Sequence, residues 1–206
     1  MMSRILSLAA LALPVIVMAD ENKEKSKTEP KDAPLQAILK ANKATYKLDL
    51  AGKSAEEVGK QIKDADQPEH YPPAPEVDLT LELKNTGDKE IQIWIGGDMT
   101  RLGLHLKGKN AINTEIKGQA FTQEIRQPQA ITLGPGKSHK IEIKKLSYGH
   151  RGASHRSLWL EPGEYMLTAT YLTGLSPAPK GSEDLGDGFG RVTLTSAEVK
   201  LKVESK

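Results

Sequence analysis

The sequence predicts an all-β chain that folds as an immunoglobulin-like antiparallel β-sandwich with one short N-terminal helix. Two features of the 206 residues carry this prediction. Apolar and polar residues alternate at the period of a strand in runs that recur from Val77 onward, and turns rich in Gly, Pro and Asn separate these runs. Aromatic residues make up only 4% of the chain, so the core is expected to consist of Leu, Ile, Val and Ala, a composition that suits strands.

Composition excludes several kinds of site. The chain has no cysteine, which excludes disulfides, thiolate catalysis, cysteine-ligated zinc and blue copper. Its 29 basic and 27 acidic residues are dispersed, with no basic block beside an aromatic platform, so no nucleic-acid binding is expected. The length fits one main domain with appended segments.

Residues 1–19 have the pattern of a signal peptide. Arg4 precedes an apolar run from Ile5 to Val17, and small residues lead to Asp20. The prediction is an exported protein, periplasmic or extracellular, with no membrane association after cleavage. An uncleaved anchor is the alternative, although the run is shorter than the roughly 20 residues that a spanning helix needs.

A disordered or weakly ordered leader is expected over 20–44. Residues 20–33 are highly charged and contain no large apolar side chain, so they cannot offset the entropy of ordering. Leu35, Ile38 and Leu39 are spaced like a short helical turn within this leader.

The segment 45–76 is expected to hold a strand, a short helix and a proline-rich connector. The strand begins around Tyr46, where apolar and polar residues alternate. Ser54 and Glu57 have the spacing of a capping box, which predicts a helix from about Ala55 to Ala65 on the sandwich surface or over an open edge.

The sandwich domain is expected to span 77–206 and to begin with a hairpin. Alternating residues in 77–83 and 91–95 flank a turn at 85–88. Further strands are expected at Leu102–Leu106, Ile131–Leu133 and Ile141–Ile143, with one or two short strands between Ala111 and Ile125.

The central strand of the sandwich is predicted within Leu158–Leu172, the most regular stretch of the chain. The last strand changes phase, because Val192 and Leu194 alternate on one parity and Leu201 lies on the other. If both runs face the core, a bulge or kink is required near Ser196.

Five short motifs carry a resemblance to a protein family: WIGGD, SYGHRG, EPGEY, SPAPKG and GDGFG. Together they resemble uncharacterised secreted proteins of planctomycete bacteria over most of the mature chain, which implies secretion and assigns no activity. More distantly, LELKNTGDKEIQIW, ITLGPGKSHKIEI and EPGEYMLTATY resemble small bacterial immunoglobulin-like domains, including the intracellular proteinase inhibitor group. In that resemblance Tyr165 is similar to the residue of a tyrosine corner, whose hydroxyl bonds nearby backbone.

The segment Tyr148–Arg156 is interpreted as a loop with candidate ligand residues. His150, Arg151, His155 and Arg156 would form a cationic patch for an acidic ligand or polysaccharide, or the two imidazoles would bind a metal. Solvated loop residues are the alternative.

Trp94 and Asp98 complete the candidate ligand residues. Trp94 lies in the outward phase of its strand, where it would anchor a protein partner or a sugar ring, unless the N-terminal helix or strand covers it. Asp98 belongs to a glycine turn, and the loops 96–98, 148–156 and 176–190 are together the expected ligand surface.

Three carboxylates, Glu183, Asp184 and Asp187, lie in a glycine-rich connection and would suit Ca²⁺. Their spacing matches no EF-hand loop. A turn-forming acidic loop is the alternative.

The sequence lacks the recognised motifs for nucleophilic, metal-dependent, phosphate-binding and dinucleotide-dependent catalysis. The leading hypothesis is a secreted or periplasmic, non-enzymatic binding module for a protein or polysaccharide, without a cofactor. The alternatives are a protease inhibitor that presents the loop 173–190 and a metal-dependent hydrolase. Oligomeric state is left open.

Overall fold

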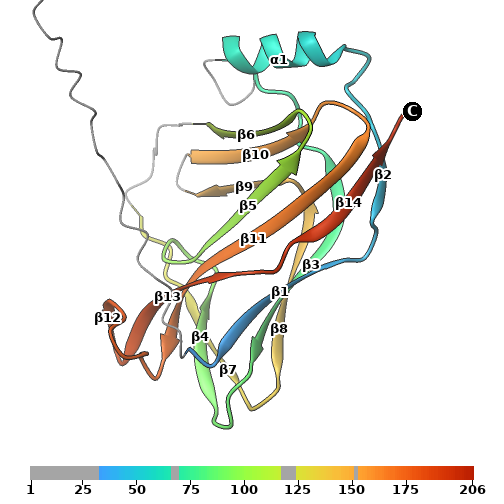
Figure 1. The fold of residues 1–206 in the computed structure, drawn as a ribbon. Coiled ribbons are helices and arrows are strands. Elements are labelled where there is room, and N and C mark those ends of the chain that lie inside the picture. The colour runs from blue at the N-terminus through green and yellow to red at the C-terminus, as the bar shows by residue number, and fades with distance from the viewer. Residues whose placement is uncertain (1–32, 66–69, 117–123, 151–152) are drawn as a thin grey trace, which may run out of the picture.

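A computed structural model describes residues 33–65, 70–116, 124–150 and 153–206 (Figure 1). The described chain consists of β-strands in several antiparallel sheets and a single short helix, which confirms the predicted all-β, sandwich-like fold. The predicted signal peptide and the charged start of the leader lie outside the described residues.

The elements in chain order are β1 (Leu35–Ala41), β2 (Thr45–Lys47), α1 (Ala55–Asp64), β3 (Glu76–Asn85), β4 (Ile91–Ile95), β5 (Arg101–Gly108), β6 (Ala111–Ile116), β7 (Gln129–Leu133), β8 (Ser138–Lys145), β9 (Ser147–His150), β10 (Ala153–Trp159), β11 (Gly163–Ser176), β12 (Asp184–Gly186), β13 (Phe189–Thr195) and β14 (Val199–Glu204).

The long strand β11 is central, as the sequence predicted for this stretch (Figure 1). It pairs antiparallel with β13 and β14 along one edge and with β4 and β5 along the other. The strand begins only at Gly163, and Leu158 belongs to the preceding strand β10. The predicted stretch therefore contains two strands that belong to different sheets.

A second sheet, in the order β1-β3-β8, covers the sheet of β11. Leu79, Leu81 and Leu83 of β3 are fully buried and share one apolar core with Leu167 and Leu201 of the facing sheet. Burial of leucine side chains between two facing sheets is the main favourable contribution to a fold of this kind.

The predicted hairpin of β3 and β4 is wrong. β3 pairs with β1 and β8, whereas β4 pairs with β7 and β11 in the other sheet. Asn85 is completely buried where the chain crosses over, and its Nδ2 donates to the carbonyl oxygens of Lys89 (2.7 Å) and Leu133 (2.9 Å). Alternation shows which face of a strand is buried, but it does not identify the partner strand.

The part of the leader from Leu35 onward is an ordered strand, so the helical turn expected there is wrong. β1 pairs with β3 over its whole length, and Leu35, Ala37 and Leu39 are buried on alternate positions. The outward-facing Ile38 had suggested a helical spacing, and the small Ala37 had hidden the period of two.

Helix α1 is present with the predicted capping box. Ser54 Oγ accepts from the Glu57 backbone N–H, and the Glu57 side chain accepts from the Ser54 N–H. Val58 buries against Leu158 and Leu160. No helix in the described part of the chain is long and apolar enough to cross a membrane.

The predicted break near Ser196 is confirmed. β13 ends at Thr195 and β14 begins at Val199, with buried side chains of opposite parity on the two strands. Ser196 bridges the break, because its N–H donates to the Ala169 carbonyl (2.9 Å) and its Oγ accepts from the Ala169 N–H (3.0 Å).

Tyr165 fills the role of the tyrosine corner. Its hydroxyl lies 2.8 Å from the Glu161 carbonyl oxygen and 3.0 Å from that of Lys109. A hydroxyl has one hydrogen to donate, so the two acceptors share it. The contact joins the start of β11 to the end of β5.

Replacing this hydroxyl tests the corner. Tyr165→Phe should lower the free energy of unfolding by about 1 kcal/mol, because the hydrogen bond to backbone is lost while the buried ring remains. Urea denaturation measures the change. Tyr71→Phe is the control, since the Tyr71 hydroxyl makes no hydrogen bond within the described residues. An equal effect of the two substitutions would contradict a structural role for the corner.

Candidate functional site

The segment Tyr148–Arg156 is a β-hairpin, so the expected loop is wrong. β9 and β10 pair antiparallel with Tyr148 opposite His155, and β6 extends this third sheet along β10. His150 pairs through its backbone with Ala153, and Arg151 lies outside the described residues. Glycines and charged residues had hidden the strands, because neither gives an apolar alternation.

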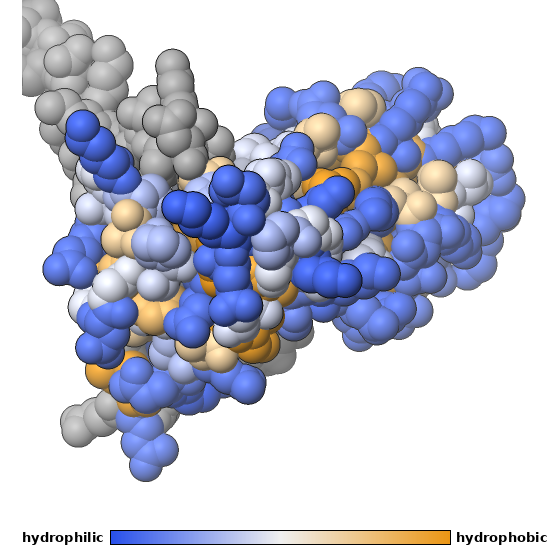
Figure 2. All heavy atoms as spheres, turned by 90° about the horizontal axis from the view of Figure 1, so that it is seen from below, coloured by the Kyte–Doolittle hydropathy of each residue, from blue (hydrophilic) through white to orange (hydrophobic). Residues whose placement is uncertain are grey.

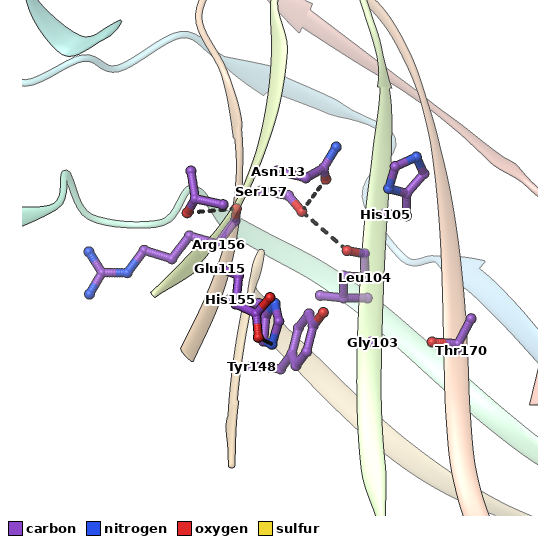
Figure 3. Close-up of a pocket in the computed structure, with 11 residues that line it drawn as sticks. Gly103, Leu104, His105, Asn113, Glu115, Tyr148, His155, Arg156, Ser157 and Thr170 are labelled. Carbon is purple, nitrogen blue, oxygen red and sulfur yellow. Dashed lines mark hydrogen bonds and ion pairs between the residues drawn. The ribbon is translucent and has the colours of Figure 1, made fainter. Parts of the chain in front are cut away.

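His155 packs on an aromatic ring within this hairpin (Figure 3). Its imidazole stacks on Tyr148 with ring centroids 4.4 Å apart and planes 7° apart. His155 Nε2 also lies 3.9 Å from a carboxylate oxygen of Glu115 on β6. The predicted ligand residue is therefore engaged with its neighbours and holds the Tyr148 ring in place.

Arg156 connects the hairpin to the proline-rich segment. Its Nη1 donates to the carbonyl oxygens of Tyr71 (3.0 Å) and Pro72 (2.7 Å). The guanidinium carbon also lies 6.0 Å from the centroid of the Tyr71 ring. These contacts direct the Arg156 guanidinium toward the backbone of the proline-rich segment rather than toward an external ligand.

Side chains of the third sheet bond the free edge of β5. Asn113 Oδ1 accepts from the Leu106 N–H, and its Nδ2 donates to the Leu106 carbonyl, both at 2.9 Å. Ser157 Oγ lies 3.3 Å from the Leu104 carbonyl oxygen. A hollow of about 270 Å³ remains between β5 and this sheet, with Tyr148 and His155 on one side (Figure 3).

A larger groove of about 500 Å³ lies on the other side of Tyr148. It is formed where β8 of one sheet faces the β4–β5 turn of the other, with Gly149 of β9 beside it. Of the described residues that line it, none is acidic and four are basic: Arg101, Arg126, His139 and Lys140. Five others are apolar or aromatic, Ile95, Leu102, Ile141, Tyr148 and Tyr171, and Thr100 and three glycines complete the described lining.

Tyr148 is the wall that the hollow and the groove share. Burial raises the pKa of its hydroxyl above the ordinary value; the nearby positive charge of Arg101 opposes that rise, and the charge of Glu115 adds to it. Arg101 therefore lies close to the Tyr148 hydroxyl. The Leu104 backbone also lowers this pKa, so the Tyr148 hydroxyl lies beside β5.

Asp98 shapes the groove instead of facing a ligand. Its side chain is only 5% exposed, and its carboxylate accepts from Arg126 Nε (3.2 Å) and from the Arg126 backbone N–H (3.0 Å). Gly97, at φ +68°, lets the two segments approach, because a Cβ there would lie 2.5 Å from the Pro128 backbone nitrogen.

The three loops expected to form one ligand surface do not all meet. The turn with Gly96 and Gly97 and the strand with Tyr148 and Gly149 converge at the groove. The connection 176–190 does not line it. Its short strand β12 pairs with β13 instead.

Trp94 packs against the fold. Its ring stacks on Phe189 with centroids 4.9 Å apart, and it lies over Gly174. The N-terminal helix does not cover it, since α1 packs on Leu158 and Leu160. Residues of β11 and of the start of β13 cover the Trp94 ring instead.

Two of the three carboxylates proposed for Ca²⁺ have separate partners. Glu183 lies 3.5 Å from Arg191 Nε, and Asp184 Oδ1 accepts from the Gly186 N–H in a turn. Asp187 has a φ of +51° beside Gly188. Across the described ranges, no group of three or more His, Cys, Asp or Glu side chains is arranged to hold a metal ion.

A substitution at Gly174 tests the packing of Trp94. A Cβ at this position would lie 2.7 Å from the indole ring, so Gly174→Ala should cost about 1–3 kcal/mol of unfolding free energy and shift the Trp94 indole N–H resonance. Gly59→Ala in α1 is the control, because a Cβ there meets nothing within 4 Å and should stabilise the protein by about 0.5–1 kcal/mol. A neutral Gly174→Ala would return Trp94 to the set of ligand anchors.

Comparisons with protein-family models, with curated proteins and with solved structures give no match. The candidate site is therefore assigned from the residues and geometry of this chain.

Proposed function

We propose that this chain is a secreted or periplasmic, non-enzymatic binding module whose groove beside Tyr148 holds an acidic ligand. The observation that carries the proposal is the lining of the groove, in which the described residues include four basic side chains and no carboxylate. A chain with nearly equal numbers of basic and acidic residues would mix the two signs on an unspecialised surface. A concave site lined by one sign of charge favours ligands of the opposite sign.

The basic residues differ in how far their charge is already balanced. Arg126 is held by the Asp98 carboxylate. Lys140 lies near Glu82, but the Glu82 carboxylate is already paired with Lys40, whose hydrogen bond is the main cause of the lowered Glu82 pKa, with a hydrogen bond from Ser138 next and the charge of Lys140 contributing least. The charge of Lys140 is therefore only weakly balanced. Arg101 forms no ion pair within the described part of the chain and is exposed. Arg101 and Lys140 are therefore the residues expected to contact an acidic group.

The two cations come from facing sheets. Arg101 begins β5, and Lys140 lies in β8. A ligand between them would contact both side chains. The Arg101 guanidinium can bind a carboxylate, sulfate or phosphate through two parallel hydrogen bonds, and the Lys140 ammonium adds a positive charge. Such a site needs no nucleophile or general base, in keeping with a non-enzymatic role.

NMR titration tests the proposed function. Glycine amides at Gly96, Gly97 and Gly149 report on the groove, and the probes are sulfate, citrate, decanoate and dextran sulfate. We expect at least one of these anions to shift the three amides saturably. Added NaCl should weaken binding, because exposed charges are screened.

Charge-removing variants identify the contacts. Arg101→Gln combined with Lys140→Gln should weaken anion binding about tenfold or more and leave the melting temperature nearly unchanged, since both side chains are exposed. Lys89→Gln combined with Lys60→Gln is the matched control, because it removes two exposed charges outside the groove. The proposal fails if no anion shifts the glycine amides, or if the double variant binds as tightly as the control.

A further inference from the structure

We infer that the ligand of this groove is an amphipathic organic anion, with one acidic group joined to an apolar body. The inference rests on the proposed function and specifies the chemical class of its ligand. It follows from the arrangement of the lining, in which apolar side chains belonging to the inner faces of both sheets adjoin the basic residues.

The apolar part of the groove continues the main core. Ile95, Leu102 and Ile141 pack against core residues but remain partly exposed, and Tyr171 beside them is only 5% exposed. Partial exposure of this kind also occurs outside the groove, for example at Ile112, and among the described residues only Ile125, at 57%, is strongly exposed. What distinguishes the groove is that its partly exposed apolar side chains lie beside basic residues. The face shown in Figure 2 is correspondingly mostly hydrophilic, with hydrophobic surface in small patches.

Tyr171 forms a fixed wall in the inner part of the groove. Burial raises the pKa of its hydroxyl, against the effect of hydrogen bonds with Thr100 and with the Gly96 backbone. The hydroxyl therefore lies beside Thr100 and Gly96 of the β4–β5 turn, which also line the groove. The ring is held as an apolar wall with a fixed orientation.

Glycines keep the groove open. Gly96, at φ +63°, has nothing within 4 Å of the position that a Cβ would take. Gly97 and Gly149 add no side chains to the lining either. At these positions the groove is lined by backbone, and no side chain fills the space. The strands β5 and β8 on the two sides of the groove are not paired with each other.

Size and chemistry together select the ligand. A volume of about 500 Å³ lies within the range of roughly 300–1,000 Å³ usual for small-molecule sites. An inorganic anion would leave the apolar side chains of Ile95, Leu102 and Ile141 in contact with water. An uncharged apolar molecule would leave Arg101 and Lys140 without an anionic ligand. An organic acid with an aliphatic or aromatic body satisfies both parts of the lining.

A series of straight-chain carboxylates tests the inference by titration calorimetry below their micellar concentrations. From acetate through hexanoate to decanoate, affinity should rise about fourfold for each added methylene group until the groove is filled. Decyltrimethylammonium has the same chain and the opposite charge, and it should bind at least tenfold more weakly than decanoate.

Substitutions in the apolar lining separate the two parts of the site. Ile141→Thr keeps a β-branched residue in β8 and should lower affinity for decanoate about tenfold while leaving weak binding of sulfate or citrate unchanged. Ile112→Thr is the control, because Ile112 is also half-buried but packs with α1 outside the groove. Melting temperatures of both variants show how much of any effect comes from stability.

The outcomes distinguish this inference from the proposed function. If sulfate, citrate or dextran sulfate binds and chain length has no effect, the amphipathic ligand is overturned and the anion site stands. If no anion binds, both are overturned. If decyltrimethylammonium binds as tightly as decanoate, the groove is merely apolar and the acidic ligand is overturned as well.

Discussion

The length of β11 is the constraint on which the rest of the structure depends. This strand has 14 residues, more than any strand that pairs with it, so each of its edges is occupied by two strands placed end to end. Wherever two such strands meet, the pairing along β11 is interrupted, and backbone groups need another partner. The fold meets this requirement differently on the two edges.

On the edge of β13 and β14 the interruption is closed. Ser196 supplies one backbone and one side-chain hydrogen bond to Ala169, so the chain passes from one strand to the next without opening the sheet. On the edge of β4 and β5, Thr173 Oγ1 donates to the Trp94 carbonyl (2.8 Å), and the chain then leaves the sheet in the turn that contains Gly96 and Gly97. The groove lies beside this turn. Its position therefore follows from the way in which β11 is paired.

The sequence predicted the faces of the strands better than their partners. Alternating residues identified β11 as central, and the change of parity identified the break at Ser196, because both depend on which side chains face the core. Pairing of β4 with β7 and β11, rather than with β3, depends on buried contacts of Asn85, and a short-range pattern does not contain them. The hairpin of β9 and β10 was missed for the related reason that Tyr148 is paired with a histidine, His155, on which it stacks, so no apolar alternation marks the two strands.

The candidate site was less predictable than the fold. The sequence drew attention to clustered charges such as His155 and Arg156, and in the structure these are engaged locally. Arg101 and Lys140 lie 39 positions apart and stand singly on their strands, so nothing in the sequence distinguishes them from solvated residues. In contrast, the two glycines of the WIGGD motif, Gly96 and Gly97, were a usable signal, because the turn they form lines the groove.

In a chain of nearly balanced charge, exposed cations act over little more than the Debye length of about 8 Å at physiological salt. Two such cations therefore provide little selectivity among acidic molecules. Discrimination has to come from what lies beside them, which in this groove is a set of partly exposed apolar side chains at the edge of the core.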